Sequence, residues 1–371
     1  MNIIKKIGIL TYHDTTNYGA VLQAFALQRK IENLGYMSEI IDYKCTAITN
    51  RYNIVPIYKS KNLKQMIKGM LMNNNKRKLK YDFYCFNNKY QKVSDLSYNK
   101  ITVKECEDRY DMIISGSDQV WNLELSGNDT TYMLDFIKDN KKKGTYAVSF
   151  GYKEIPTKYY ERTKKNIITF NKILVREQQG KKIIEKMLDK KADVVLDPTL
   201  LFNKKEWLKL LDIQDKILKR DYILLYIIAP NKNIIKFTKY LAKQKKCKII
   251  YINDSYKKIA GMKNIGHCTP KEFLQYIYNA KYVVTTSFHG VAFSINFEKE
   301  FFYALSNEKE NFNSRIENLI QIVDIKNRNI NAQCDISKKI NYDIISRKLD
   351  LKRDESEKML KQELDGINDK K

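Results

Sequence analysis

Four short segments of this chain carry the residue types best suited to chemistry, and each follows an apolar run. The segments are HDTTNYGA at 13–20, SGSDQVW at 115–121, VRE at 175–177 and TTSFHG at 285–290. His289 is the first candidate, because histidine is the side chain that most readily exchanges a proton near neutral pH. Arg176 is the second, because a guanidinium holds a carboxylate or a phosphate through two parallel hydrogen bonds. Its structural alternative is an ion pair with a neighbouring acid.

The remaining candidates each have a structural alternative as well. Asp118 is suited to act as a general base or to bind a hydroxyl group, but it equally fits a helix cap. Trp121 is suited to stack on a sugar ring, although burial in the core is favoured. The helix start at Asn17 and Gly19 offers backbone amides to an anion, with Asp14 close by in the sequence. Its alternative is that Asn17 caps the helix while Gly19 packs against the sheet.

Strands and helices must position these segments, and the chain alternates short β-branched runs with longer helical patterns. This alternation predicts βαβ units and parallel sheets. The expected strands lie at 7–12, 37–43, 111–115, 145–150, 172–176, 193–197, 222–229, 248–252, 282–287 and 300–305. The region 45–105 is expected to hold helices inserted between strands. The four segments therefore lie at the carboxyl ends of strands, where open α/β sheets bind their ligands.

The predicted fold class is α/β, with two doubly wound, Rossmann-like domains facing a cleft. A length of 371 residues suggests two domains, since one domain typically has about 150 residues. We expect an N-terminal domain at 1–203, a C-terminal domain at 221–330 and a helical tail at 331–371. A charged helical segment at 203–221 connects the first two.

Composition narrows the classes of function. Lys and Arg number 68 against 43 Asp and Glu, a net charge of +25 that suits nucleic acid, an anionic membrane surface or an acidic small molecule. The six cysteines form no CxxC pair, and no His or Cys spacing fits a metal site, so we expect a reduced cytoplasmic protein without bound metal. The N-terminus lacks a signal-peptide pattern, and the longest apolar run, 222–230, is shorter than a membrane span.

Taken in order, several motifs resemble those of the polysaccharide pyruvyl transferase family. They are IGILTYHDTTNYGAVLQAFAL, SGSDQVWN, YAVSFG, VREQQG, LDPTLLF, TSFHGVAFSINF and RIENLI, and together they span about residues 5–323. The resemblance implies a fold of the glycosyltransferase B type. It also implies transfer of a pyruvyl unit from phosphoenolpyruvate onto two sugar hydroxyls, which gives a cyclic pyruvate ketal and free phosphate.

The resemblance also assigns roles to the candidate residues. His289 is implied to be the acid, and Asp118 is a weaker candidate for activating the acceptor hydroxyl. Other residues are implied to bind substrate, namely Arg176, Arg315, Ser287, Gly290, Asn17, Gly19 and Asp14. Many relatives have an arginine where this chain has Ser287, so Arg315 is expected to compensate. The N-terminal domain is implied to take the acceptor and the C-terminal domain the donor, with no cofactor and no metal.

The expected partners are phosphoenolpyruvate and a glycan or lipid-linked oligosaccharide acceptor. The basic region 61–92 is expected to face an anionic glycan or the inner face of the membrane. Two rival functions remain open. A glycosyltransferase that uses a nucleotide-sugar would share the same cleft and helix termini. A nucleic-acid binder would explain the charge, but the aromatic and basic stretch at 76–92 belongs to no recognised module.

Overall fold

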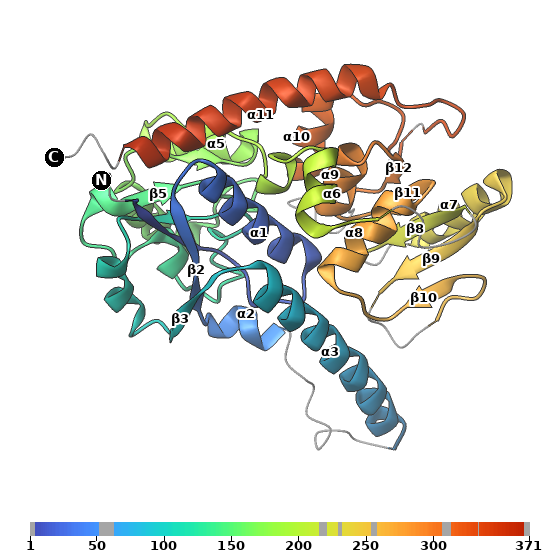
Figure 1. Ribbon diagram of the computed structural model, residues 1–371, viewed down its shortest axis with the longest axis horizontal. Helices are drawn as coiled ribbons and strands as arrows, with labels where there is room; N and C mark the ends of the chain where they lie inside the picture. The colour runs from blue at the N-terminus through green and yellow to red at the C-terminus, as the bar shows by residue number, and fades with distance from the viewer. Residues whose placement is uncertain are drawn as a thin grey trace. The chain divides into compact units, whose positions relative to one another are not determined.

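The computed structural model describes residues 4–51, 63–214, 221–228, 232–253, 258–305, 313–332 and 334–366 (Figure 1). The chain divides into two compact units. The first contains Met1–Arg51, Asn87–Phe202 and Lys348–Lys371, and the second contains Tyr52–Phe86 and Asn203–Arg347. These units differ from the predicted domains in two places, because 52–86 groups with the second unit and the end of the predicted tail groups with the first.

The sheet of the first unit is entirely parallel. Its strands are β1 (Lys6–Leu10), β2 (Met37–Tyr43), β3 (Val93–Tyr98), β4 (Met112–Ser115) and β5 (Lys143–Thr145). Their spatial order is β3-β2-β1-β4-β5. A second, two-stranded parallel sheet pairs β6 (Leu174–Val175) with β7 (Asp193–Val194). Strand β3 was not among the expected strands, since its VSDLSY sequence has only two buried positions.

Helices lie in the chain between the strands of the first unit, and two of the helices contain residues of both units. They are α1 (Tyr18–Asn33), α2 (Thr46–Arg51), α3 (Leu63–Tyr90), α4 (Thr157–Ile167), α5 (Gln178–Leu188) and α11 (Tyr342–Asp365), with short 3-10 turns at Val103–Arg109, Thr131–Met133, Asn140–Lys142 and Pro198–Leu200. Helix α1 begins where Asn17 caps it and is followed by Gly35 at φ +91°, a conformation that glycine adopts without strain. The expectation of helices within 45–105 is confirmed by α2 and α3.

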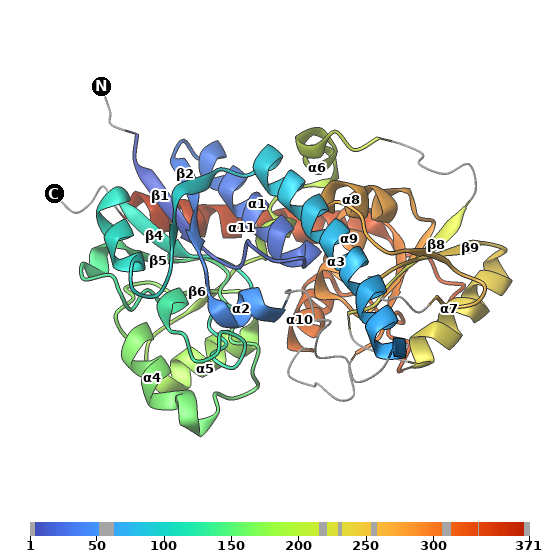
Figure 2. The same cartoon turned by 90° about the horizontal axis from the view of Figure 1, so that it is seen from below.

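The second unit repeats the same strand order. Its strands are β8 (Tyr222–Tyr226), β9 (Lys248–Ile252), β10 (Lys263–Ile265), β11 (Tyr282–Thr285) and β12 (Glu300–Tyr303), arranged as β10-β9-β8-β11-β12 and all parallel. Its helices are α6 (Lys204–Leu211), α7 (Lys232–Lys245), α8 (Pro270–Asn279), α9 (Phe288–Asn296) and α10 (Ser314–Val323). Figure 2 shows α7 lying along β8 and β9. Thr269 and Glu272 form the expected capping box at the start of α8.

The central strands of a parallel sheet are covered on both faces, and this explains why strands such as β4 and β8 are buried along their whole length. Strand β4 is buried at all four positions, and so are all five positions of β8. The α/β class predicted from the sequence is therefore confirmed, with one parallel five-stranded sheet in each unit. The strand order reverses between β1 and β4 in the first unit and between β8 and β11 in the second. At such a reversal, successive helices go to opposite faces of the sheet and open a ligand crevice at the carboxyl ends of the strands.

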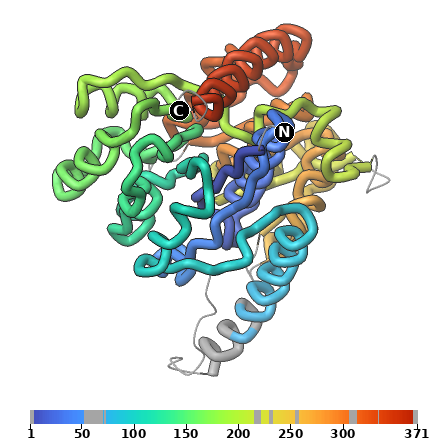
Figure 3. The backbone as a smooth tube through the Cα atoms, turned by 60° about the vertical axis from the view of Figure 1, so that its left-hand side comes forward, coloured from blue at the N-terminus to red at the C-terminus, as the bar shows by residue number. Residues whose placement is uncertain are grey.

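Helix α11 completes the first unit at a point late in the sequence. Leu360 and Leu364 are fully buried, and the Ser356 hydroxyl accepts the backbone N–H of Leu196 at 3.0 Å. Lys30 of α1 forms an ion pair with Glu357 at 2.8 Å. Figure 3 shows α11 in red and α3 in pale blue as two long continuous helices. In the part of the chain that the structure describes, no helix is long and apolar enough to cross a membrane.

Candidate active site

The loop after β1 places three of the predicted site residues. The Asn17 side chain accepts the N–H groups of Gly19 and Ala20 at 3.0 and 3.3 Å, so these two amides at the start of α1 already have a partner. The cap, which was the structural alternative for Asn17, is therefore present. Asp14 is half exposed and contacts the Lys44 ammonium at 2.7 Å.

Lys44 also contacts Asp42 at 2.8 Å, and the buried His13 ring approaches the same carboxylate with Nε2 at 2.9 Å. Burial alone would raise the pKa of Asp42. The hydrogen bonds from His13 and Lys44 outweigh that effect and hold the pKa of Asp42 well below its ordinary value. The Asp42 carboxylate of β2 is thus favoured in its charged form, and it joins the end of β2 to His13 in the loop after β1.

Arg176, at the end of β6, lies among three carboxylates. The nearest contact of its guanidinium joins Nη1 to Asp197 Oδ2 at 3.0 Å. The Arg176 Nη2 atom lies 3.5 Å from Asp118 Oδ1, and its Nε atom lies 3.6 Å from Glu177 Oε2. The Arg176 side chain is only 2% exposed.

Hydrogen bonds hold two of these carboxylates in place. Asp197 Oδ1 accepts the N–H and hydroxyl of Thr199 at 3.0 and 2.7 Å, and Asp197 Oδ2 accepts the Ser117 hydroxyl at 3.2 Å. The Ser149 hydroxyl donates to Glu177 at 2.6 Å. Burial alone would lower the pKa of Arg176, but the charges of Asp118, Asp197 and Glu177 outweigh burial and raise it.

This arrangement matches the ion-pair alternative for Arg176. The three ion-pair contacts of the guanidinium are made to side chains of the protein itself. The sequence analysis missed Glu177 and Asp197 as members of this cluster. Their position in the sequence was the available signal. Glu177 directly follows the strand expected at 172–176, and Asp197 is the last residue of the strand expected at 193–197.

Asp118 lies at the end of β4 in an unusual backbone conformation. Its φ is +79°, which a residue with a side chain rarely adopts, and its carbonyl accepts the Ser149 N–H at 3.0 Å. The carboxylate is 13% exposed. Trp121 is fully buried against Phe150 and Phe170, so the core interpretation is confirmed for that residue.

The first turn of α9 places the predicted residues of the second unit. Ser287 caps the helix by accepting the Gly290 N–H at 3.3 Å. A Cβ atom on Gly290 would lie 2.4 Å from the Thr285 hydroxyl oxygen, so only glycine lets this turn approach the end of β11 so closely. His289 stands between these two residues in the sequence and is buried, with 6% of its surface exposed.

Arg315 lies beside this turn, near the start of α10. Its guanidinium stands 5.9 Å from the centre of the Phe288 ring, and that ring packs edge-on against His289 with ring centres 5.0 Å apart. A cation in the first turn of a helix is disfavoured by the helix dipole. The structure thus brings Ser287, His289, Gly290 and Arg315 together within the second unit, and Asp118 with Arg176 within the first.

No group of His, Cys, Asp and Glu among the described residues is arranged to hold a metal ion. No disulfide joins any of the six cysteines, all of which lie in the described part of the chain. The predicted site residues at these strand ends offer an imidazole, carboxylates, guanidinium groups and helix amides.

Comparisons with known proteins add two findings. A family model described as polysaccharide pyruvyl transferase matches residues 17–309. A search of curated proteins finds no match to the chain.

Several solved structures share low similarity with the chain. A UDP-GlcNAc 2-epimerase from Methanocaldococcus jannaschii is 12% identical, with 95% of this chain and 93% of that chain covered and a TM-score of 0.47. A UDP-GlcNAc 2-epimerase from Neisseria meningitidis is 10% identical, with 94% and 98% covered and a TM-score of 0.42. A heptosyltransferase from E. coli is 9% identical, with 83% and 89% covered and a TM-score of 0.36. Likeness at this level supports no conclusion about function.

Replacing Arg176 with Gln tests the charge cluster. We expect the first unit to lose about 3–5 kcal/mol of stability, because three carboxylates lose the cation that compensates them. The chain has two tryptophans, so in a W207F background the fluorescence of Trp121 reports urea unfolding of the first unit. The control is R109Q, which removes an arginine paired with the exposed Asp95 and should change little. Equal effects of the two variants would contradict the structural role of Arg176.

Replacing Asp42 with Asn tests the link between β1 and β2. Because the pKa of Asp42 is lowered in the folded protein, its stabilisation is complete above the ordinary aspartate pKa of about 4 and is lost progressively as the pH falls from there through the lower pKa of the folded state. We expect D42N to cost about 1–3 kcal/mol at pH 7 and less at pH 3. Urea unfolding at both pH values measures this, with D14N as a control that shares Lys44. A pH-independent difference would disprove the account.

Proposed function

This chain belongs to the polysaccharide pyruvyl transferase family, and from that premise we propose that it transfers a pyruvyl group from phosphoenolpyruvate to a glycan. Two hydroxyl groups of one sugar accept the group, and the products are a cyclic pyruvate ketal and inorganic phosphate. The observation that carries the proposal is the first turn of α9, where His289 and Arg315 flank the Phe288 ring.

The donor is an anion with a phosphate and a carboxylate, so its binding needs positive charge. Arg315 supplies a guanidinium, and the start of α9 adds the partial positive charge of a helix N-terminus. An anion there would also relieve the unfavourable position of Arg315 in the first turn of α10. Ser287 stands where many relatives have an arginine, and in this chain we assign that anion-binding role to Arg315.

His289 is proposed as the general acid. It protonates the methylene carbon of phosphoenolpyruvate, which becomes a methyl group and leaves a cationic centre on the neighbouring carbon. The first sugar hydroxyl attacks that carbon. Loss of phosphate and attack by the second hydroxyl close the ketal. Of the two hydroxyl protons, one replaces the proton that His289 gave and the other leaves with phosphate.

The first unit is proposed to take the acceptor. Asp118 lies at a strand end with part of its carboxylate exposed, which suits a role in holding or deprotonating a sugar hydroxyl. Arg176 is then a positioning residue, because it is buried and contacts Asp118 while Asp197 holds it from the other side. Asp14, Asn17 and Gly19 remain weaker candidates for acceptor binding.

The predicted contact of region 61–92 with a glycan or a membrane stays a prediction. Within the described part of this region, α3 carries Tyr81 and Tyr84 with 67% and 61% of their surfaces exposed. Arg77 and Lys78 are exposed on the same helix. Tyrosine and basic side chains are common at both kinds of surface, so they do not choose between the two.

Replacing His289 with Ala tests the general acid. We expect phosphate release from phosphoenolpyruvate, in the presence of a lipid-linked oligosaccharide or cell-surface glycan, to fall by about 100-fold or more. The control is H267A, which removes another histidine of the same unit, one that pairs with Asp82 at 2.7 Å. Circular dichroism checks that both variants are folded. Near-normal turnover by folded H289A would refute the assignment.

Replacing Arg315 with Gln tests donor binding separately from catalysis. Millimolar phosphoenolpyruvate should raise the melting temperature of the native protein, because a ligand that binds only the folded state stabilises it. The shift should be lost in R315Q and kept in K326Q, which removes an exposed lysine of the same unit. Stabilisation by a nucleoside diphosphate instead of phosphoenolpyruvate would favour a glycosyltransferase and count against the proposal.

A further inference from the structure

A groove lies beside the edge strand of the second sheet, where the chain makes an unusually short connection. In the first sheet, the connection from β2 to β3 contains helix α3. The equivalent connection of the second sheet, from β9 to β10, has only residues 253–262, and those of them that are described form no helix. In a doubly wound sheet this connection normally places a helix beside the preceding one, which here is α7. The groove therefore lies where such a helix would cover the sheet.

The groove has an apolar floor. Its volume is about 780 Å³, and its lining includes Ala242, Ile249 and Met262. Ile249 belongs to the buried core of the second unit, whereas Ala242 and Met262 are only partly buried against that core. The floor is thus an uncovered part of the core surface.

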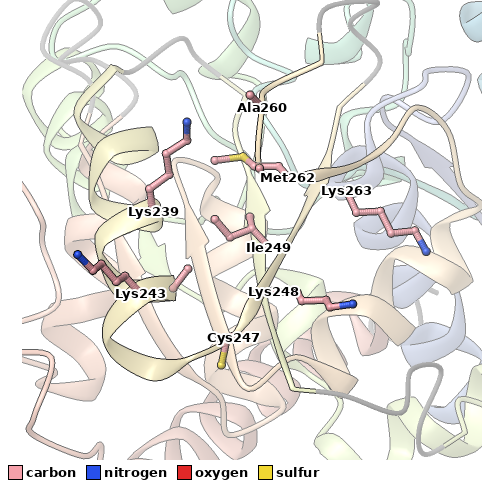
Figure 4. A pocket seen from close by; sticks show the side chains of 10 residues that line it. Lys239, Lys243, Cys247, Lys248, Ile249, Ala260, Met262 and Lys263 are labelled. Atoms are coloured by element: carbon pink, nitrogen blue, oxygen red, sulfur yellow. The ribbon is translucent and has the colours of Figure 1, made fainter.

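Four lysines stand around this floor. Lys239 and Lys243 come from α7, Lys248 from β9 and Lys263 from the start of β10. Figure 4 shows Lys239 and Lys243 on one side of Ile249 and Lys248 and Lys263 on the other, with their ammonium groups directed away from it. Among the described residues that line the groove, none is acidic. Such a surface attracts a ligand that combines an apolar face with negative charge at its edges.

We propose that this groove binds an anionic polysaccharide, and in particular the pyruvylated part of the polymer. A pyruvate ketal carries a methyl group and a carboxylate on the same carbon. The methyl group and the C–H face of the sugar fit the apolar floor, and the carboxylate reaches the lysines at the rim. The identification of the ketal rests on the proposed function, whereas binding of a carboxylated glycan does not.

The position of the groove separates it from the proposed chemistry. Lys248 and Lys263 are the first residues of β9 and β10, while His289 follows the carboxyl end of β11 in the same parallel sheet. The groove and His289 therefore belong to opposite ends of the strands. The groove holds polymer that has already been modified, which keeps the glycan on the protein between transfers.

The test measures binding of the full chain to polygalacturonate, which carries a carboxylate on every sugar, with neutral dextran as the reference. We expect polygalacturonate to bind, dextran not to bind, and binding to weaken as salt rises. The double variant K243E/K263E, with one change on each side of the groove, should bind about tenfold more weakly or worse. The control K358E/K361E makes the same change of charge on exposed positions of α11 and should bind as the native chain does.

Two further measurements give the remaining outcomes. The pyruvate ketal of a methyl galactoside should compete with polygalacturonate better than the parent galactoside does, and equal competition would overturn the assignment to ketals. Loss of binding to phosphatidylglycerol vesicles in K243E/K263E, with polygalacturonate binding unchanged, would make the groove a lipid contact and overturn the proposal. Equal loss of polygalacturonate binding in K243E/K263E and in K358E/K361E would also overturn the proposal. If the chain binds polygalacturonate but forms no ketal, the proposed function is refuted, whereas the groove is still supported as a glycan-binding site.

Discussion

The buried guanidinium of Arg176 is the constraint on which the first unit depends. It joins residues that follow three different strands, because Asp118 follows β4, Glu177 follows β6 and Asp197 follows β7. Charges so close together in a buried place are stable only when each has its partner. The strand ends are therefore fixed relative to one another, and Asp118 is held in a backbone conformation that a non-glycine residue rarely adopts.

The sequence was most informative where the determinants are local. The strands and the starts of α1, α8 and α9 follow from apolar runs and from caps within a few residues, such as Ser287 before Gly290. The environment of Arg176 was not predictable in this way. Its partners Asp118 and Asp197 lie 58 and 21 residues away, and only the fold determines that they meet. Strand β3 and the grouping of α11 with the first unit also depend on distant contacts.

The two sheets share one topology but use their reversal points differently. In the first unit, the loop after β1 carries Asp14 and the loop after β4 carries Asp118, and both carboxylates are suited to hydroxyl groups. In the second, the turn after β11 carries His289 in the first turn of α9, with Arg315 beside it. Under the proposed function, this difference suits the first unit to an acceptor hydroxyl and the second to an anionic donor.

Helix α11 has a consequence for how the protein is made. Glu357 pairs with Lys30 of α1, and Ser356 accepts the backbone N–H of Leu196. Leu360 and Leu364 are buried in the core of a unit whose first strand begins at Lys6. During synthesis the N-terminal half of the chain leaves the ribosome long before these residues exist. The first unit therefore cannot finish packing until the second has been made, so the order of folding differs from the order of translation.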